Sequence, residues 1–318
     1  MDNITIEPKT AIIIPTYNSC QILNIALQKL NTLKKRELFD IFVIDNGSTD
    51  KTSVVVKQFK DIYYLRLSKN YFICRAINIG FKKFFLQNKY KYLLIMAHDV
   101  LIDRTTPILM VEYLEKYKDI GLLGAAQFEY DTSILRTTGH SINSTTSILI
   151  NYADSSQVNK INHFSSMFII PTHVYKNVGG LDDVLFPMIF EEPDIGERVL
   201  RAGYKIKCCI KAKIWHPIEI KKNKISKIQI REERMYSNSA KTYLFFRNRI
   251  LYMSLYAGFF RFLIFYLIFN PVIFLYYFIK VRPEFKIYVV KGFIDGSFFA
   301  LTKDRRYIEK QNKSILNI

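Results

Sequence analysis

Three carboxylates stand within four residues at Glu191, Glu192 and Asp194, at the start of a stretch with helical periodicity. Proline is favoured in the first turn of a helix and disfavours helical backbone in the residue before it. Pro193 therefore predicts a helix over residues 192–202 that begins with Glu192 in an extended conformation. The positive end of the helix dipole favours an ionised carboxylate, the form that a general base needs. Taken alone, the cluster is also typical of an acidic first turn without a catalytic role.

Polar residues also follow the predicted strands of the first hundred residues, where short apolar runs alternate with helical periodicity. The predicted strands are residues 11–14, 39–44, 63–67 and 92–97. This alternation predicts βαβ units and a mainly parallel sheet, in which ligands bind beyond the carboxyl ends of strands. The polar groups at these ends are Thr16-Tyr17-Asn18, Asp45-Asn46 and His98-Asp99. We therefore expect a ligand site at this edge of the sheet.

Four separated segments, in this order and spacing, resemble the family 2 inverting glycosyltransferases of the GT-A fold. The segments are AIIIPTYNS (11–19), FVIDNGSTD (42–50), NYFICRAINIG (70–80) and FEEPDIGERVLRAGYKI (190–206). The resemblance covers roughly residues 9–218. It implies an α/β fold of the GT-A type, Rossmann-like, with a mainly parallel mixed sheet flanked by helices. RNRI (247–250) and KGFIDG (291–296) are more weakly similar to the C-terminal part of bacterial polysaccharide rhamnosyltransferase-like members.

The resemblance also implies which residues would hold a nucleotide-sugar donor. They are Pro15, Thr16, Asn18, Asp45, Arg75 and Asn78, and Phe72 stands where the family pattern has its first glycine. The loop at 15–18 offers backbone N–H groups and a hydroxyl, Asp45 an acceptor for a base or ribose, and Arg75 a guanidinium for phosphates. Residues 45–48 are also typical of a turn that caps a helix.

A divalent metal is the cofactor that the resemblance implies. The D-x-D of the family falls on Ala97-His98-Asp99, so only its last acid is kept. Mg²⁺ and Mn²⁺ prefer oxygen ligands and take much of their coordination from phosphates and water. We therefore expect Mg²⁺ or Mn²⁺ on Asp99, with His216 in the position of a C-terminal histidine ligand, and with His98 and Asp103 as further candidates.

The acidic cluster matches the E-D-x-D of the family, whose second acid is the usual general base, and this assigns that role to Glu192. Glu191 and Asp182 are expected on the acceptor side, and Asp194 either binds the acceptor or braces the loop. The implied reaction is one displacement, in which Glu192 takes the proton of an acceptor hydroxyl as it attacks the anomeric carbon. The nucleotide diphosphate leaves and the anomeric configuration is inverted.

Composition excludes several other classes of protein. With 318 residues, 49% of them hydrophobic and 23% charged, the chain can build a core and is not a disordered protein. The four cysteines include no C-x-x-C pair, which argues against a disulfide scaffold and fits a reducing compartment. The first ten residues lack an apolar run, so we predict no signal peptide. One catalytic domain over 1–218 and a second region over 219–318 are expected.

The second region combines positive charge with apolar, aromatic stretches. Residues 219–318 hold 19 Lys and Arg against 7 Asp and Glu, which is two thirds of the net charge of +18. Residues 262–279 are uncharged, and we expect Asn270-Pro271 to break them near the middle. Three interpretations stay open: amphipathic helices lying in a membrane surface, a span or re-entrant hairpin, and an ordinary packed core. Basic residues that would meet anionic lipid are Arg247, Arg249, Arg261, Lys280, Arg282 and Lys286.

The sequence therefore predicts an inverting glycosyltransferase at the cytoplasmic face of a bacterial inner membrane, bound there peripherally or monotopically. It would extend a lipid-linked oligosaccharide for a surface polysaccharide such as O-antigen or capsule, with a deoxyhexose such as rhamnose. Nucleic-acid binding is not expected, because the basic residues flank apolar segments and form no basic helix. The alternatives are an inactive membrane scaffold with a transferase fold and a sugar nucleotidyltransferase, although PTYNS lacks the Gly-rich basic loop of the latter.

Overall fold

The computed structural model describes residues 9–85, 90–130, 132–154, 157, 160–216 and 238–317. The chain divides into two compact units that interleave in sequence. The sheet unit comprises Met1–Ser141, Asn151–Leu181 and Ile195–Lys221, and the helical unit comprises Ile142–Ile150, Asp182–Asp194 and Lys222–Ile318. The domain boundary predicted at residue 218 lies outside the described residues. The acidic segment 182–194 groups with the C-terminal helices.

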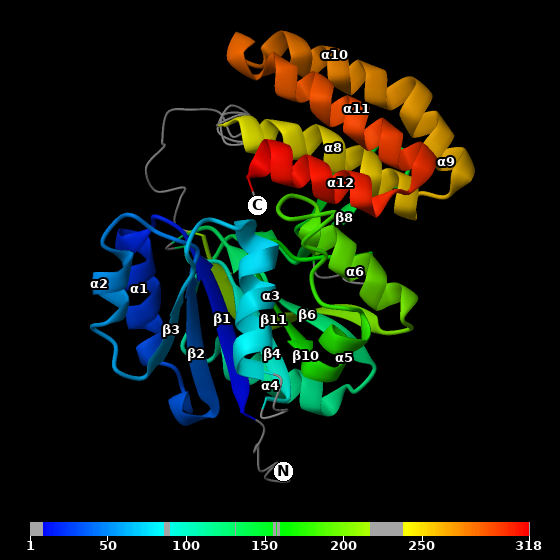
Figure 1. The fold of residues 1–318 in the computed structure, drawn as a ribbon. Coiled ribbons are helices and arrows are strands. Elements are labelled where there is room, and N and C mark those ends of the chain that lie inside the picture. Colours follow the sequence, from blue (N-terminus) through cyan, green and yellow to red (C-terminus); the bar gives the residue numbers. More distant parts are fainter. Residues whose placement is uncertain are drawn as a thin grey trace. The chain divides into compact units, whose positions relative to one another are not determined.

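A mixed sheet of nine strands, counted over the described residues, forms the sheet unit (Figure 1). Its order is β3-β2-β1-β4-β10-β6-β11-β5, with β7 paired to β6. The strands are β1 (Thr10–Thr16), β2 (Phe39–Asp45), β3 (Ile62–Arg66), β4 (Tyr92–Met96), β5 (Leu101–Ile102), β6 (Ile120–Phe128), β7 (Leu135–Thr137), β10 (Met167–Pro171) and β11 (Lys205–Trp215). The four predicted strands are confirmed and run parallel as β3-β2-β1-β4, whereas β10 is antiparallel to β4 and β6. A separate pair joins β8 (Gly139–Ile142) to β9 (Leu149–Tyr152).

Helices cover both faces of this sheet because strand side chains alternate between faces. On one face, Ile12 and Ile14 share a core with α1 (Cys20–Asn31), α2 (Thr52–Val56) and α4 (Thr106–Lys116). On the other face, α3 (Phe72–Phe85) lies over the strands (Figure 1), and the ring centroids of Phe42 and Phe85 are 4.8 Å apart. A Cβ at Gly80 would lie 2.7 Å from the Ile44 side chain, so glycine lets α3 approach β2 closely. The smaller elements are η1 (Arg36–Leu38) and α5 (Thr172–Asn177).

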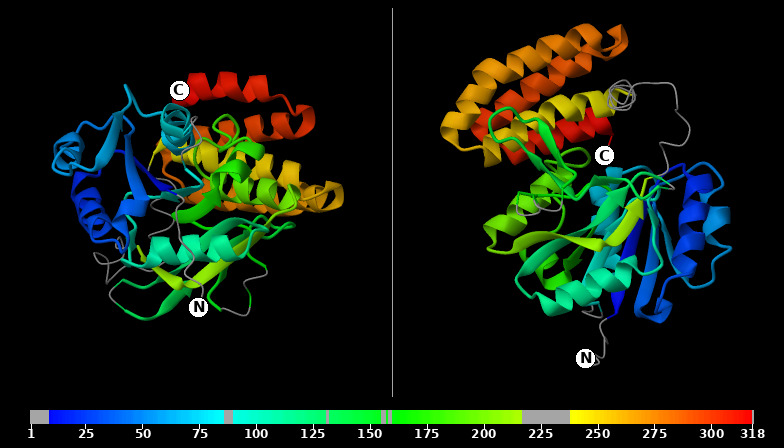
Figure 2. Two further views of the ribbon diagram at one scale, coloured as in Figure 1. Left: turned by 90° about the horizontal axis from the view of Figure 1, so that it is seen from below. Right: turned by 180° about the vertical axis from the view of Figure 1, so that it is seen from behind.

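The helical unit is built around the pair α8 and α11. Its elements are α8 (Ser239–Tyr256), α9 (Phe259–Ile264), η4 (Phe265–Phe269), α10 (Asn270–Lys280), η5 (Pro283–Phe285), α11 (Lys286–Thr302), α12 (Arg305–Gln311) and η6 (Asn312–Leu316). A Cβ at Gly292 would lie 2.5 Å from the Tyr243 carbonyl oxygen, and one at Gly296 would lie 3.0 Å from that of Arg247. The glycines of KGFIDG therefore allow the two helices to pack backbone against backbone. Helices α10 and α11 lie side by side (Figure 2), with Phe274 and Phe293 in contact.

The break predicted at Asn270-Pro271 is wrong. Phe259–Lys280 forms one helix of 22 residues, long and apolar enough by length and composition to cross a membrane, with only 11% of its most apolar window buried. A π-helical turn at Phe265–Phe269 precedes Pro271. Proline lacks an N–H and clashes with the carbonyl four residues earlier, and the wider turn relieves both constraints. The exposure of this helix also disfavours the interpretation as an ordinary packed core.

The extended conformation predicted for Glu192 is wrong as well. Helix α6 (Glu191–Arg201) already includes Glu191 and Glu192, and Pro193 is its third residue. The first N–H groups of a helix have no intrahelical partner, so proline is tolerated throughout the first turn. The turn of the chain lies earlier, at Ile189 and Phe190, whose φ angles are 66° and 73°.

Candidate active site

The carboxyl ends of β1 and β2 place Thr16 and Asp45 opposite each other in the parallel register. The predicted gathering of polar groups at this edge is therefore confirmed for these two residues. Thr16 is buried, and its hydroxyl has no hydrogen-bond partner among the described residues. Buried hydroxyls are nearly always hydrogen-bonded in folded proteins. A ligand that reaches this strand end could form a hydrogen bond with the Thr16 hydroxyl, which is already removed from water.

Asp45 is completely buried and its carboxylate is fixed from two sides. One oxygen accepts the Ser48 N–H at 2.8 Å, and the other accepts the Tyr64 hydroxyl. Burial, followed by this hydrogen bond to Asp45, raises the pKa of Tyr64. The turn predicted at residues 45–48 thus exists. A carboxylate has about four acceptor positions, so this structural role leaves room for a ligand contact.

Asn18 joins the loop after β1 to the loop after β2. Its backbone N–H donates to Ser48 Oγ at 3.0 Å, and its side-chain oxygen accepts the Thr49 N–H at 2.7 Å. Asn18 has a φ of 49°, a left-handed conformation that asparagine tolerates better than most residues. The contacts give it a bracing role, and the adjoining Pro15 carbonyl lies 3.3 Å from His98 Nδ1.

Asn46 is a buried residue of this edge to which the sequence assigned no role. Its amide nitrogen donates to Asn70 Oδ1 at 2.8 Å, and its amide oxygen accepts the Tyr71 N–H at 2.8 Å. It therefore ties the end of β2 to the start of α3. The sequence shows an amide side chain directly after a buried strand. It does not show that the hydrogen-bond partners of this side chain lie 24 and 25 residues away.

The start of α3 carries the next predicted contacts. Phe72, which replaces a glycine of the family pattern, has a φ of 62°, so the backbone keeps the left-handed conformation that glycine favours. Arg75 is exposed, and its guanidinium carbon lies 5.3 Å from the centroid of the Tyr71 ring. Arg75 is therefore accessible to an anionic ligand.

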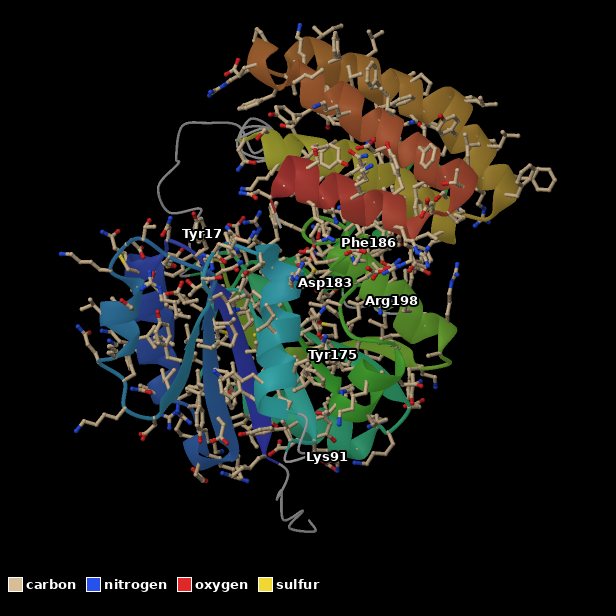
Figure 3. The ribbon with its side chains drawn as sticks, viewed as in Figure 1. Tyr17, Lys91, Tyr175, Asp183, Phe186 and Arg198 are labelled. Atoms are coloured by element: carbon tan, nitrogen blue, oxygen red, sulfur yellow. The ribbon has the colours of Figure 1, made fainter. Side chains whose placement is uncertain are left out.

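Asn78, also predicted to contact the donor, makes two hydrogen bonds within the sheet unit. Its amide nitrogen donates to the Leu181 carbonyl at 2.8 Å, and its amide oxygen accepts the Tyr175 hydroxyl at 2.9 Å. Tyr175, labelled in Figure 3, lies beside α3 in that view. Arg198 of α6 donates to the carbonyls of Val178 and Gly180, so this turn is held from two helices (Figure 3).

Asp99 and His216, the two residues predicted to bind a metal, lie next to each other. Their Oδ1 and Nε2 atoms are 3.4 Å apart, and both side chains are largely buried. Burial would raise the pKa of the Asp99 carboxyl, but the hydrogen bond and electrostatic interaction with His216, together with His98, hold it below its ordinary range. Two ligands of one Mg²⁺ or Mn²⁺ ion stand roughly 3 Å apart when each is about 2.1 Å from the metal. The pair therefore fits such an ion.

No group of three or more His, Cys, Asp or Glu side chains that could hold a metal occurs within the described ranges. Asp103, considered as a further ligand, accepts the N–H and the hydroxyl of Thr105 at 2.8 and 2.6 Å. Its contacts are those of a residue that caps a turn. The remaining coordination of an ion at Asp99 would have to come from ligand oxygens and water.

The acidic cluster lies in the helical unit at the start of α6. Glu191 is 8% exposed, and its Oε2 has no hydrogen-bond partner among the described residues. Burial, followed by the charges of Glu192 and Asp194, raises the pKa of Glu191 well above its ordinary value. Glu192 is only half-buried. The two neighbouring carboxyl groups therefore differ, since burial favours the neutral form of Glu191 whereas Glu192 reaches solvent.

Asp182 and Asp194 bind other residues of the helical unit. The Arg305 guanidinium forms two hydrogen bonds with the Asp182 carboxylate at 2.6 and 3.0 Å, and the Leu185 N–H donates to the same group. Asp194 is 2% exposed and accepts the Tyr256 hydroxyl at 2.6 Å. The hydrogen bond from Tyr256 to Asp194 is consistent with a residue that braces the loop. The hydrogen bonds of Asp182 to Arg305 and Leu185 also hold the loop.

Replacing Glu191 with glutamine should change how stability depends on pH. The proton on Glu191 stabilises the folded protein, so this contribution is complete below the ordinary pKa of 4.5 and is lost as the pH rises through the raised value. Glutamine stays neutral throughout. We expect the melting temperatures of Glu191→Gln and wild type to converge near pH 4.5 and the variant to become the more stable one towards pH 8. A constant difference between the two across this range would show that Glu191 is not held neutral.

A hollow of about 540 Å³ also opens in the sheet unit. Its lining includes Lys29, Arg104, Phe128, Lys213 and Trp215. Asp103, considered as a further metal ligand, also lines it, but none of the other residues predicted to bind donor or metal does, so we do not assign the reaction to this hollow.

Comparison with known proteins agrees with the predicted family. The model of glycosyl transferase family 2 matches residues 11–177. The poly-beta-1,6-N-acetyl-D-glucosamine synthase of Staphylococcus epidermidis is 26% identical over 204 residues, which are 63% of this chain and 47% of that protein. The chondroitin synthase of Escherichia coli is 28% identical over 130 residues, 39% of this chain and 18% of that protein. The chain thus aligns with less than half the length of these curated relatives.

Solved structures show the same fold at low identity. A mannosyltransferase from Pyrobaculum calidifontis in complex with GDP-Man and Mn²⁺ has a TM-score of 0.56 at 14% identity, covering 94% of this chain and 89% of that one. Residues 1–349 of S. aureus TarS in complex with UDP-GlcNAc have a TM-score of 0.55 at 15% identity, covering 96% and 92%. The α/β fold of the GT-A type is confirmed. Because the family model covers more than half of the chain, this protein belongs to glycosyl transferase family 2.

Proposed function

We propose that this protein moves a sugar from a nucleotide-diphosphate donor to a hydroxyl of a glycan acceptor, with inversion at the anomeric carbon. The observation that carries the proposal is the Asp99–His216 pair, which follows β4 and β11 of a family 2 sheet in a form that fits a divalent ion. The neighbouring ends of β1 and β2 supply polar groups for a nucleotide.

The donor would lie along the carboxyl edge of the sheet. Thr16 offers its unpartnered buried hydroxyl, Asp45 its remaining acceptor positions, and Arg75 an exposed guanidinium for the diphosphate. Pro15 and Asn18 shape the loop between these groups. Asp99 and His216 would hold Mg²⁺ or Mn²⁺, which supplies neutralisation of charge on the departing diphosphate. The structural neighbour solved with GDP-Man also contains Mn²⁺, which is consistent with this assignment.

Glu192 would act as the general base. As the acceptor oxygen forms its bond to the anomeric carbon, the bond from that carbon to the diphosphate oxygen breaks, and the hydroxyl proton passes to a Glu192 carboxylate oxygen. Glu192 reaches solvent at the first turn of α6, where the helix dipole favours its ionised form. The raised pKa of Glu191, caused by burial and by the charges of Glu192 and Asp194, disfavours a competing negative charge beside it.

A thermal-shift panel with UDP-, dTDP- and GDP-sugars, each with and without Mn²⁺, tests the donor proposal. We expect at least one nucleotide sugar to raise the melting temperature, and the increase to be larger with Mn²⁺, because ligands that bind only the folded state stabilise it. Turnover of that donor with a glycan acceptor should follow. If no nucleotide sugar stabilised the protein, the proposal would be wrong.

The acceptor would be a lipid-linked oligosaccharide at the cytoplasmic face of the bacterial inner membrane, where the protein binds peripherally or monotopically. In support, the helix Phe259–Lys280 exposes large apolar side chains, among them Phe260 at 78%, Val272 at 65% and Ile279 at 70%. The basic residues that flank this helix suit anionic lipid. The curated relatives are a poly-beta-1,6-N-acetyl-D-glucosamine synthase and a chondroitin synthase, which is consistent with a role in a surface polysaccharide such as O-antigen or capsule. A deoxyhexose such as rhamnose remains our expectation for the sugar.

Charge on the apolar helix should abolish membrane binding. Val272→Glu with Leu275→Glu alters two side chains that are 65% and 59% exposed, so folding should be preserved. Burial of two such side chains in lipid is worth about 3–6 kcal/mol, so binding to phosphatidylglycerol vesicles should fall by well over tenfold. Val54→Glu, at a residue of the sheet unit that is 57% exposed, is the matched control. Equal sedimentation of the double variant and the control with vesicles would contradict the membrane proposal, as would preferential binding to DNA.

A further inference from the structure

Two successive residues immediately before the acidic cluster have left-handed backbone. Ile189 and Phe190 have φ angles of 66° and 73°, and neither is a glycine. Left-handed backbone is unfavourable for L-residues and most unfavourable for a β-branched residue such as isoleucine. Such conformations persist only where the surrounding structure holds them, and they gather at functional sites. The chain therefore stores strain directly ahead of Glu191 and Glu192.

Asn248 of α8 holds this strained turn. Its amide nitrogen donates to the Met188 carbonyl at 2.9 Å and to the Ile189 carbonyl at 2.7 Å. Asn248 has no exposed surface. Both amide hydrogens therefore form hydrogen bonds with successive carbonyls of the turn. Burial excludes water that would compete for them. The peptide groups on either side of Ile189 are fixed as a result.

Arg247 forms a hydrogen bond with Asn248 and further hydrogen bonds along the same loop. Its Nε donates to Asn248 Oδ1 at 2.8 Å, which orients the amide, and its Nη2 donates to the Leu185 carbonyl at 2.8 Å. Its Nη1 donates to Asn312, whose own amide donates to the Val184 carbonyl at 2.7 Å. Arg247 is fully buried and Asn312 is 3% exposed. Three buried side chains therefore hold four carbonyls of the segment 184–189.

Packing holds the side chains of the turn as well. The ring centroids of Phe190 and Tyr252 are 5.3 Å apart, and Ile189 packs against the cluster that contains Phe245 and Val289. These contacts come from α8 and α11, the same helices that carry RNRI and KGFIDG. RNRI thus contacts the acidic loop directly, and KGFIDG packs against the helix that carries RNRI.

We propose that Asn248, oriented by Arg247, is a positioning residue that holds Ile189 and Phe190 in left-handed backbone so that α6 begins at Glu191 and presents Glu192 to the acceptor. This inference rests on the proposed function, in which Glu192 is the general base. It assigns to the C-terminal helices a part in catalysis besides membrane binding. Asn248 itself touches neither donor nor acceptor.

The test compares Asn248→Ala with Asn270→Ala, a matched change at another buried asparagine of the helical unit, which is 2% exposed and lies on α10. Both variants are assayed below their melting temperatures. We expect Asn248→Ala to lower kcat at least tenfold while the KM for nucleotide sugar stays within about twofold, because the donor groups lie in the sheet unit. Asn270→Ala should retain kcat within about threefold, since the Asn270 amide nitrogen has no hydrogen-bond partner among the described residues and therefore does not hold the loop.

A rescue experiment separates positioning from general destabilisation. In the Asn248→Ala background, Ile189→Gly should recover part of the lost kcat because glycine adopts positive φ freely, whereas Ile189→Ala should not. Equal kcat in the two double variants would overturn the inference, as would a parallel loss of kcat and donor affinity in Asn248→Ala.

Asn248→Ala could fail to fold, or no nucleotide sugar could be turned over. The inference is then tested by comparing the single variants Ile189→Gly and Ile189→Ala. Ile189→Gly should then melt at a higher temperature than Ile189→Ala, the reverse of the usual order for these two residues. The usual order would show that the turn is not strained and would overturn the inference. Absence of turnover together with the reversed order would contradict the proposed function and leave the strained turn supported.

Discussion

Replacing Glu192 with glutamine is expected to lower the rate of sugar transfer by about 10²–10⁴-fold and to leave donor binding nearly unchanged. Glutamine keeps the size of the side chain but cannot accept the proton of the attacking hydroxyl. Glu192 is half-buried in the first turn of α6 and the donor groups belong to the sheet unit, so the nucleotide should still bind. The measurements are release of nucleotide diphosphate at saturating donor and acceptor, and the thermal shift produced by the donor.

Glu191→Gln is the matched control for this variant. Burial and the charges of Glu192 and Asp194 raise the pKa of Glu191 and so favour its neutral form, for which the amide is a close substitute. Its transfer rate should stay within about threefold of wild type. If Glu191→Gln removed activity and Glu192→Gln did not, the general base would be Glu191 and our assignment would be wrong.

Asp99→Asn should reduce transfer by on the order of 10²-fold at low Mn²⁺. The amide keeps the shape of the side chain but loses the negative charge that attracts a divalent cation. The distance of 3.4 Å from His216 Nε2 places Asp99 beside the other candidate ligand, so the two should act on one ion. Raising the Mn²⁺ concentration should restore part of the rate, because weakened affinity is offset by mass action.

Asp103→Asn tests whether any neighbouring acid would give the same result. The Asp103 carboxylate caps Thr105, so its loss should cost about 1 kcal/mol of stability and leave the Mn²⁺ dependence of transfer unchanged. An identical Mn²⁺ response in wild type, Asp103→Asn and Asp99→Asn would remove Asp99 from the metal site. A loss at Asp99 that no concentration of Mn²⁺ improves would indicate a structural role.

The parallel part of the sheet was predictable because its signals are local. Each of β1, β2 and β4 is a short apolar run bounded by polar or turn residues, and their order follows from the handedness of βαβ connections. The antiparallel insertion of β10 between β4 and β6 was not predictable, since it depends on pairing between residues about seventy positions apart. The continuity of Phe259–Lys280 also escaped prediction, because a π-helical turn can accommodate a proline that otherwise ends a helix.

The candidate site was predictable in its residue types and less so in their roles. Thr16, Asp45 and Asp99 stand where strand ends and spacing place them. The resemblance assigns Asn78 to the donor and Asp182 to the acceptor side, yet both side chains form hydrogen bonds with other parts of their own units. A motif records which side chain is present, whereas its hydrogen-bond partners depend on distant segments. The hydrogen bonds that Asn46 forms with the start of α3 could not be predicted for the same reason.

The sequence alone determined the family, the strand ends that carry polar groups and the concentration of positive charge and aromatic residues in the last hundred positions. These features depend on residue type and on spacing along the chain. Only the tertiary structure decided that the acidic loop 182–194 groups with the C-terminal helices and that Asn248 bonds to a carbonyl sixty residues earlier. It also decided that burial raises the pKa of Glu191 while Glu192 reaches solvent. Burial and backbone strain arise from contacts between distant segments, and two adjacent glutamates differ only through those contacts.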